Sequence, residues 1–442
     1  GIWSVIFMKI TFIGAGSTVF ARNVIGDCIL TPELGSFDVC LFDIDPKRLD
    51  ESYQILTNIN KTANGKANIT QTLDRETAFR GADFVVNAIQ VGLYEPCTVT
   101  DFEVPKKYGL RQTIADTLGI GGIFRALRTI PVMKAYADDM ERWCPNAIFL
   151  NYTNPMAMLT GYMQRYTNVK TVGLCHSVQA CVPHLLDEVS MSEYKDNVRW
   201  EIAGINHQAW LLKVEDLAGN DLYPEIKRRA FDSQYITERQ DLVRLELMRQ
   251  FGYYVTESSE HNAEYTPWFI KDKYPELIER YKIPLDEYPR RCVKQINGWN
   301  EMRDSLLRDS HIEHKKTHEF ASYIIKAVLL DQPYRIHGNV LNTGLITNLP
   351  ANACVEVPVM VDRNGLNPCY VGDLPEQCAA LNRTNINVQL LTIKAAETLK
   401  KEYIYMAAML DPHTSSELSI DDIRALCDDL IEAHGDWLPK FH

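Results

Sequence analysis

The sequence predicts an α/β protein in which an N-terminal Rossmann-like domain, with a doubly wound parallel sheet, packs against a C-terminal α+β domain. Three observations predict this fold. In the first part of the chain, short apolar runs alternate with stretches long enough for helices, and the first run ends in a glycine turn. From about residue 196, paired strand-like segments and amphipathic helices replace that alternation. We therefore expect the first domain over 8–195 and the second over 196–442.

Five strands are expected in the first domain, each separated from the next by a region with room for a helix. Ligands of such sheets gather at the carboxyl ends of the strands, so polar residues that follow these runs are the candidates for chemistry. The expected strands are KITFIG (9–14), FDVCLFDI (37–44), DFVVNAI (83–89), AIFLNYT (147–153) and KTVGLC (170–175).

The second domain is expected to begin with an antiparallel pair. This pair is WEIAGINH (200–207) and WLLKVEDLAG (210–219), and later strands are expected in VLNTGLI and CVEVPVMVD. Amphipathic periodicity predicts helices near 225–250, 300–328, 385–410 and 420–434. No repeat and no linker separates the two halves, so we expect them to pack closely.

The composition is that of a soluble globular protein. The chain has 442 residues, of which 46% are hydrophobic and 24% charged, and this length is enough for two domains. The net charge is −12 and no basic stripe occurs, which argues against binding to nucleic acid.

The N-terminal segment contains the longest apolar run, but this run is too short for a membrane span and Lys9 interrupts it. A signal peptide is not expected either, because there is neither a basic leader nor a small-residue cleavage site. We interpret Met8 as the natural start and residues 1–7 as an upstream remnant. The eleven cysteines, an odd number without any CxxC pair, indicate a reducing cytoplasm in which thiols stay free.

The first glycine turn predicts a dinucleotide site. KITFIGAGS ends a strand in two glycines and then opens a helix, which allows a pyrophosphate to approach the helix N-terminus. Val19 stands where the third glycine of the fingerprint would fall, and the spacing to the acidic residue is longer than the usual about 20 residues. A carboxylate after the second strand favours NAD over NADP. The expected cofactor contacts are Gly14, Ala15, Gly16, Ser17, Asp43 and Asp45.

Two further side chains suggest a metal. Cys175 closes the run VGLC and His207 closes the run AGINH. A thiolate and an imidazole suit a transition metal, and two protein ligands leave positions at which a substrate can chelate the ion. A buried cysteine or a lone histidine is also often structural, so the two residues by themselves leave both interpretations open.

Several long blocks of the chain resemble the NAD-dependent glycoside hydrolases of family 4, and within them the α-galactosidase (melibiase) branch. The resemblance extends from Met8 to the C-terminal AHGDWLP. The blocks are TFIGAGS, YEPCTVTDFEVPKKYGLRQTIADTLGIGGIFRALRTIP, LNYTNPMAM, VGLCHSVQ, AGINH, ESSEHNAEYTPWFIK and IERYKIPLDEYPRRC.

This resemblance implies an unusual mechanism for cleaving terminal α-galactosides such as melibiose. NAD would take a hydride from C3 of the sugar, and a base would then remove the acidified C2 proton. The aglycone would leave from C1, water would add, and the ketone would be reduced again. A divalent metal, usually manganese, would chelate the O2 and O3 oxygens.

The resemblance also assigns residues. Cys175 and His207 match the metal ligands, Asn154 matches a substrate-binding position, and Tyr265 stands where the catalytic base is expected. Asp116 is expected near Tyr265, whose phenol needs help to act near pH 7. His176 replaces the aspartate that acts as the acid in the α-glucosidase branch. It is interpreted as the general acid, or alternatively as a donor that supports a metal-bound water.

Other candidates have less support. Arg290 and Arg291 could contact sugar hydroxyls or cofactor phosphates, or could be a solvated basic pair. Glu95 is expected near the cofactor or the sugar, and GIGG (119–122) is expected to begin a helix near the site.

Three alternative functions stay open. The first is an NAD-dependent hydroxyacid or sugar dehydrogenase, which would accumulate NADH. The second is an α-glucosidase or α-galacturonidase of the same family, and the third is an NAD-bound sugar sensor. The resemblance also suggests a homodimer or homotetramer, with no nucleic-acid or membrane partner.

Overall fold

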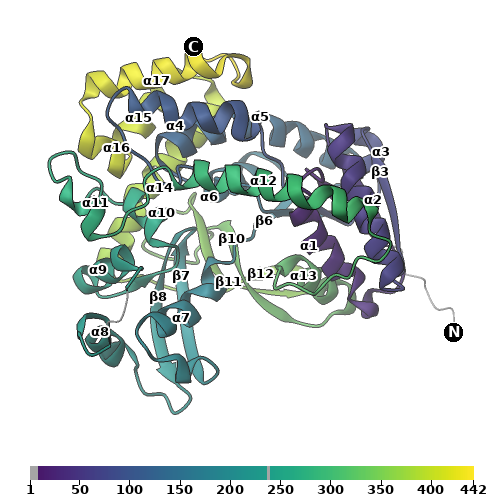
Figure 1. Cartoon of the computed structure of the whole chain (residues 1–442), viewed down its shortest axis with the longest axis horizontal. Coiled ribbons are helices and arrows are strands. Elements are labelled where there is room, and N and C mark those ends of the chain that lie inside the picture. The colour runs from purple at the N-terminus through teal and green to yellow at the C-terminus, as the bar shows by residue number, and fades with distance from the viewer. Residues whose placement is uncertain (1–7, 236–238) are drawn as a thin grey trace.

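The structure is a computed structural model that describes residues 8–235 and 239–442. Within these residues twelve strands form one mixed sheet (Figure 1). The prediction that residues 1–7 precede the natural start concerns residues outside the described part of the chain.

The first half of the sheet is parallel and confirms the predicted Rossmann-like topology. Its strand order is β3-β2-β1-β4-β5-β6, and all five pairings are parallel. The five strands predicted for this half all form, but β3 was not predicted, because its sequence ANITQT is polar and lies half-exposed at the sheet edge. The strands are β1 Lys9–Ile13, β2 Phe37–Phe42, β3 Ala67–Thr72, β4 Phe84–Asn87, β5 Ile148–Asn151 and β6 Lys170–Gly173.

The second half of the sheet is antiparallel and continues directly from the first. Strand β10 pairs with β6 through Asn339 and Gly173, so that the order runs on as β6-β10-β11-β7-β8-β9. The predicted antiparallel pair is β7 and β8. The division at residue 195 stays a prediction. The strands are β7 Val198–Ile205, β8 Gln208–Asp216, β9 Tyr254–Val255, β10 Tyr334–Leu341, β11 Cys354–Asp362 and β12 Gly365–Pro368.

Helices cover both faces of the parallel strands. Along these strands the side chains alternate, so that Phe12 packs with α1, α2 and α13, whereas Val85 packs with α5, α6 and α14. These helices are α1 Thr18–Ile29, α2 Pro46–Thr62, α5 Gly119–Trp143, α6 Met156–Tyr166, α13 Phe320–Leu330 and α14 Glu376–Thr398. In the described part of the chain, no helix has the length and apolar content that a membrane crossing requires.

The remaining helices are shorter or lie outside these two layers. They are α3 Arg75–Phe79, α4 Val99–Lys106, α7 Ser177–Glu188, α8 Tyr223–Phe231, α9 Leu242–Phe251, α10 Ser259–Glu264, α11 Glu276–Arg280, α12 Glu287–Arg308, α15 Lys401–Leu410, α16 Pro412–Glu417 and α17 Ile420–His434.

Three of the four predicted helices in the second half are each divided in two. The span 225–250 is α8 and α9, the span 385–410 is α14 and α15 with Leu399 between them at φ 59°, and the span 300–328 is the end of α12 and most of α13. The last break has a clear cause. The buried Asp27 on α1 accepts hydrogen bonds from the Thr317 N–H and from His314, both at 2.8 Å, which holds the connection between α12 and α13 in an irregular conformation.

Candidate active site

Three side chains converge in a geometry that suits a metal ion. Cys175 follows β6, His207 lies in the turn between β7 and β8, and Glu257 follows β9. The His207 Nε2 atom lies 3.6 Å from the Cys175 Sγ and 3.1 Å from the Glu257 Oε2, and the three ligand atoms all lie within 4.8 Å of one another. The predicted pair is therefore brought together, and Glu257 joins it as a third donor that we did not predict.

The ring of His207 is aimed by its backbone and by its second nitrogen. His207 has φ 66°, in the left-handed region that residues other than glycine seldom adopt. Its Nδ1 atom lies 3.0 Å from the Tyr265 hydroxyl and 3.3 Å from the Thr117 hydroxyl. These contacts leave Nε2 facing the thiol and the carboxylate, as in metal sites where the second nitrogen of a histidine is held by a neighbouring group.

The protonation state of the Cys175 thiol depends on whether a cation lies beside its sulfur. Burial, together with the nearby Glu356 and Glu257 carboxylates, raises the pKa of the Cys175 thiol to about 12. A buried thiol of this kind becomes a thiolate when a cation binds next to its sulfur. Its donor set of sulfur, nitrogen and oxygen therefore fits a divalent transition metal.

Tyr265 lies beside this cluster at the end of α10. It is 4% exposed, and its hydroxyl contacts both the His207 ring and the Thr117 hydroxyl. Burial raises the pKa of Tyr265 well above its ordinary value, although the hydrogen bond with Thr117 opposes this shift. The phenol thus needs a nearby positive charge before it can act as a base.

Asp116 lies close to this group but does not hydrogen-bond the phenol. Its Oδ1 atom lies 3.6 Å from the Nε2 of His261, whose ring packs edge-to-face against His207 with centroids 4.6 Å apart. Burial disfavours the charge of Asp116, yet His261, Arg125 and His207 together outweigh burial, and the pKa of Asp116 lies below its ordinary value. Its neighbour Thr117, which we did not single out from the sequence, makes the contact that we expected of Asp116.

A buried carboxylate holds the loop that carries Asp116 and Thr117. Glu264 accepts hydrogen bonds from the backbone N–H groups of Thr113, Ile114 and Ala115. Burial raises the pKa of Glu264 to about 7. Because Glu264 directly precedes Tyr265, one turn of α10 positions both the phenol and the loop that faces it.

His176 lies at the start of α7, next to Cys175. Its Nε2 atom lies 2.8 Å from the Glu319 Oε1, and its ring stacks on Phe320 at a centroid distance of 6.1 Å. The hydrogen bond to Glu319 raises the pKa of His176 above its ordinary value. Glu319 itself is 8% exposed, and it is a partner that the sequence did not reveal.

The glycine turn fits a dinucleotide. Gly14 has φ 84°, and an added Cβ there would lie 2.7 Å from the backbone of Ala88, so only glycine fits this turn. Ser17 stands at the N-cap of α1 without a side-chain capping bond, and the first turn of α1 holds no acidic residue. The helix N-terminus therefore has N–H groups available for a pyrophosphate.

The two acidic residues after β2 have different positions. The Gly16 N–H donates to Asp43 Oδ2 at 2.7 Å, which places this carboxylate against the glycine turn where a ribose would lie. Asp45 instead caps α2 by accepting from the N–H groups of Lys47 and Arg48. Of the two, Asp43 has the geometry expected of a ribose ligand.

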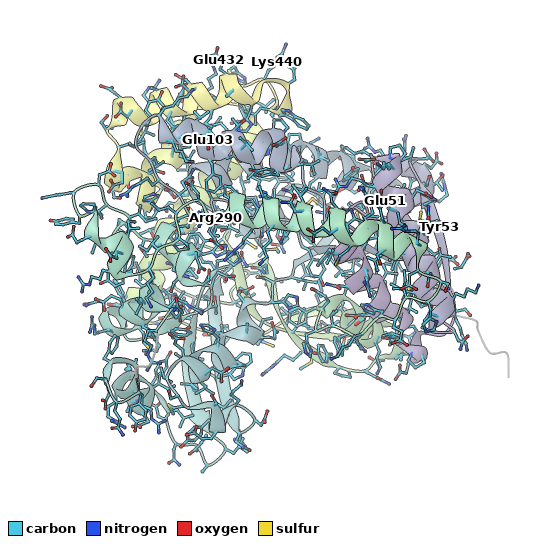
Figure 2. The ribbon with its side chains drawn as sticks, viewed as in Figure 1. Glu51, Tyr53, Glu103, Arg290, Glu432 and Lys440 are labelled. Carbon is cyan, nitrogen blue, oxygen red and sulfur yellow. The ribbon has the colours of Figure 1, made fainter. Side chains whose placement is uncertain are left out.

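The predicted substrate residues are spread more widely. Asn154 is half-buried after β5, and its side chain makes no hydrogen bond to another described residue. Glu95 is exposed. Arg290 donates to the Leu285 carbonyl and to Glu287 and lies at the outer surface of α12 (Figure 2). Arg291 also pairs with Glu287 but turns toward Glu260 of α10, 4.0 Å away.

The segment that carries Glu257 and α10 is anchored by a buried ion pair. Asp241 accepts from Arg244 Nε at 2.8 Å and from the Ser259 hydroxyl at 2.7 Å, and both charged side chains are buried. Although burial disfavours its charge, Arg244, His184 and Tyr254 hold the pKa of Asp241 at about 2.

Replacing Asp241 with asparagine is expected to lower the free energy of unfolding by about 3–5 kcal/mol near pH 7, because Arg244 is left buried without its partner. The folded pKa of Asp241 is lowered, so its contribution is complete above the unfolded pKa and is lost as pH falls toward about 2. Urea unfolding of the wild type and of Asp241→Asn measures the difference in their free energy of unfolding. This difference should shrink as the pH falls from 4 to 2. Asp232→Asn, which removes a surface ion pair with Arg228, should cost about 1 kcal/mol or less. Equal losses for the two variants would contradict the prediction.

Two family models and several known proteins match this chain. The family model described as "Family 4 glycosyl hydrolase" matches residues 9–191, and the model described as "Family 4 glycosyl hydrolase C-terminal domain" matches residues 202–414. An alpha-galactosidase of Bacillus subtilis (strain 168) is 61% identical over 433 residues, covering 98% of this chain and 99% of the relative. An alpha-galactosidase of Rhizobium meliloti (strain 1021) is 33% identical over 445 residues, covering 98% and 89%.

Solved structures share the fold. A 6-phospho-alpha-glucosidase from gut microorganisms, in complex with NAD and Mn2+, has a TM-score of 0.79 at 20% sequence identity and covers 99% of this chain and 100% of its own. The two family models together match most of the chain, and the two alpha-galactosidases match it over nearly its full length. The chain therefore belongs to the family 4 glycosyl hydrolases.

Proposed function

We propose that this chain is an α-galactosidase that hydrolyses terminal α-galactosides with the help of NAD and a divalent metal. The observation that carries the proposal is the cluster of Cys175, His207 and Glu257 beside the Tyr265 hydroxyl, on a sheet whose first turn fits a dinucleotide. The Bacillus subtilis relative, 61% identical, is named an alpha-galactosidase, which supports galactose as the sugar.

Cys175, His207 and Glu257 would hold the metal, and the turn from Gly14 to Ser17 together with Asp43 would hold NAD. When bound, the metal supplies a Lewis acid for the sugar hydroxyl oxygens and NAD supplies a hydride acceptor. Asp43 favours NAD over NADP, because its charge would repel a 2′-phosphate. Cys175 must be reduced to act as a ligand, which is consistent with the reducing cytoplasm that the cysteine usage predicts.

The protein's own residues would move the protons. Tyr265 would accept the C2 proton at its phenolic oxygen after releasing its own proton to solvent, a loss that a cation bound at the adjacent cluster would favour, and Thr117 and His207 would fix the position of that oxygen. His176 would donate a proton from its imidazole to the leaving oxygen, with Glu319 holding the ring in place. Asp116 would hold the His261 ring in place, and His261 in turn packs against the ring of His207. Of the predicted sugar ligands, the half-buried Asn154 would bind the sugar, because its side chain has no hydrogen-bond partner among the described residues, whereas Glu95, Arg290 and Arg291 are exposed.

The test uses purified protein and p-nitrophenyl α-galactoside, with NAD, manganese and a thiol reductant added singly and together. We expect nitrophenol release only with all three, and no accumulation of NADH. Release from the α-glucoside or the α-galacturonide alone would show that the protein is an α-glucosidase or an α-galacturonidase of the same family. Steady NADH formation from a free sugar or hydroxy acid, without release from any glycoside, would show a dehydrogenase and overturn the proposal.

A further inference from the structure

One buried arginine near the candidate active site has no acidic partner. Arg125 lies near the start of α5 and is 8% exposed. In the part of the chain that the structure describes, its guanidinium forms no ion pair, and its one hydrogen bond is donated by Nη1 to the Tyr288 hydroxyl at 3.2 Å. Because a buried charge without a partner is costly, folding alone does not explain an arginine at this position.

The neighbouring Arg128 shows the contacts of a structural arginine in the same helix. It lies one turn further along α5, pairs with the buried Asp101 at 2.9 Å and donates to the Val91 carbonyl at 3.1 Å. Arg125 has no such contacts. Its Nη2 and Nε atoms are not enclosed by protein either, unlike the Nη1 atom of Arg128, so they touch space that solvent reaches. These donors are therefore available to a bound molecule.

Tyr288 holds the Arg125 side chain beside the loop that faces Tyr265. The guanidinium lies over the Tyr288 ring, 5.6 Å from its centroid, and the Tyr288 N–H donates to the Thr113 carbonyl at 3.0 Å. The loop continues from Thr113 to Asp116. Burial disfavours the charge of Arg125, yet Tyr288 and Asp116 are the main groups that raise its pKa above the ordinary value. Arg125 and Asp116 therefore attract each other without forming an ion pair, and each can bind a polar group of a ligand.

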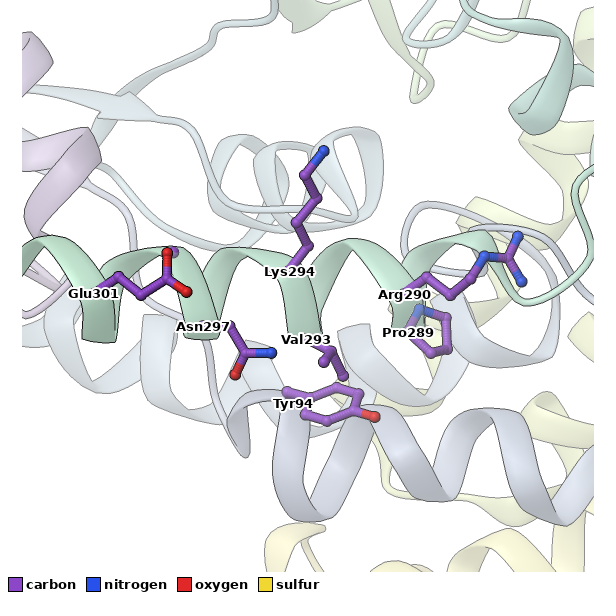
Figure 3. Close-up of a pocket in the computed structure, with 8 residues that line it drawn as sticks. Tyr94, Pro289, Arg290, Val293, Lys294, Asn297 and Glu301 are labelled. Carbon is purple, nitrogen blue, oxygen red and sulfur yellow. The ribbon is translucent and has the colours of Figure 1, made fainter.

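The arginine that we predicted for the sugar lies elsewhere. Arg290 extends from α12 beside a surface groove of about 690 Å³ that Pro289 and Val293 also line (Figure 3). It is exposed and already pairs with Glu287 at 2.8 Å. An exposed, paired cation adds little to the binding of a neutral sugar. Arg125, which is buried and unpaired, is the better candidate for the role that we expected of Arg290.

We propose that Arg125 is a specificity-determining residue that donates hydrogen bonds to the sugar, at the hydroxyl oxygen on C4 or on C6. This role rests on the proposed function, in which the metal chelates O2 and O3 and the aglycone occupies O1. The hydroxyl groups of galactose that then remain for the protein are those on C4 and C6. A guanidinium with free N–H groups is a strong donor to such an oxygen.

The charge of Asp116 favours a neutral sugar beside Arg125. An unpaired guanidinium by itself would attract the C6 carboxylate of an α-galacturonide. The carboxylate of Asp116 would repel that group, whereas a galactose hydroxyl carries no charge and is not repelled. The two side chains together therefore support galactosides over galacturonides.

Deoxygenated substrates test the proposal. The wild type and Arg125→Met are compared on p-nitrophenyl α-galactoside and on its 4-deoxy and 6-deoxy analogues, with NAD and manganese present. On the galactoside, Arg125→Met should lower kcat/KM about 10–100-fold, because it loses a hydrogen bond from a charged donor. The wild type should lose a similar factor on one of the two analogues, and on that analogue the substitution should cost nothing more. The analogue concerned identifies the oxygen that Arg125 binds.

Two further variants support this comparison. Arg142→Met is the matched control, because Arg142 lies in the exposed last turn of the same helix, over the Trp143 ring. It should cleave all three substrates as the wild type does. Arg125→Lys keeps the charge but loses the planar guanidinium, so it should show the same dependence on substrate with a smaller loss. It replaces Arg125→Met if that variant lacks the wild-type circular dichroism spectrum.

Calorimetry gives a measurement that does not depend on turnover. Galactose should bind Arg125→Met about 10–100-fold more weakly than the wild type, and the deoxy sugar that lacks the contacted hydroxyl should bind both proteins equally. An equal loss on all three substrates, or no loss in either Arg125 variant, would overturn the proposal. A wild type that binds galactose through Arg125 but cleaves no α-galactoside would support this role and contradict the proposed function instead.

Discussion

Replacing Tyr265 with phenylalanine is expected to lower kcat on p-nitrophenyl α-galactoside by about 10²–10⁴-fold and to leave KM nearly unchanged. The substitution removes the phenolic oxygen that contacts Thr117 and His207 and preserves the ring in its buried site. Because the proposed proton transfer from C2 needs this oxygen, binding of the sugar should survive while turnover fails. Steady-state kinetics at saturating NAD and manganese measure both constants.

A second measurement separates this role from a structural one. In heavy water the wild type should incorporate deuterium at C2 of the released galactose, and Tyr265→Phe should lose this exchange in proportion to kcat. Tyr136→Phe is the matched control, since Tyr136 is a buried tyrosine of α5 that packs against Phe42 and Phe79 away from the cluster. Normal exchange in Tyr265→Phe would assign the base to another residue.

Replacing Glu257 with glutamine is expected to weaken manganese binding by at least about 10–100-fold. The change keeps the size of the side chain but removes the negative charge that lies 3.1 Å from His207 Nε2. The pKa of Glu257 is already below its ordinary value, since the nearby His207 and His261 favour its charge over the penalty of burial. Titration of the apo-protein with manganese, followed by electron paramagnetic resonance, gives the affinity without relying on turnover.

Glu260→Gln is the matched control for this prediction. Glu260 lies three residues further along the same segment, but its carboxylate faces Arg291 rather than the cluster. It should bind manganese as the wild type does. If Glu257→Gln bound manganese as tightly as Glu260→Gln, the metal would be held by Cys175 and His207 alone.

Local sequence patterns were enough to predict the parallel strands and the glycine turn. Buried parallel strands appear as short apolar runs, and the turn after β1 needs glycine because of its backbone and its contact with Ala88. The polar edge strand β3 has no such run. The breaks between paired helices were missed because they depend on distant contacts, such as those that Asp27 makes with His314 and Thr317.

The sequence by itself determined the α/β class, the dinucleotide turn and the chemical candidates Cys175, His207 and Tyr265, because each of these follows from local residue types or from long resembling blocks. Only the tertiary structure decided which carboxylates join them. Glu257, Glu264 and Glu319 are acidic residues among many, and their partners lie tens of residues or more away along the chain. Their positions follow from how the strands and helices of the two halves pack, which no local pattern records.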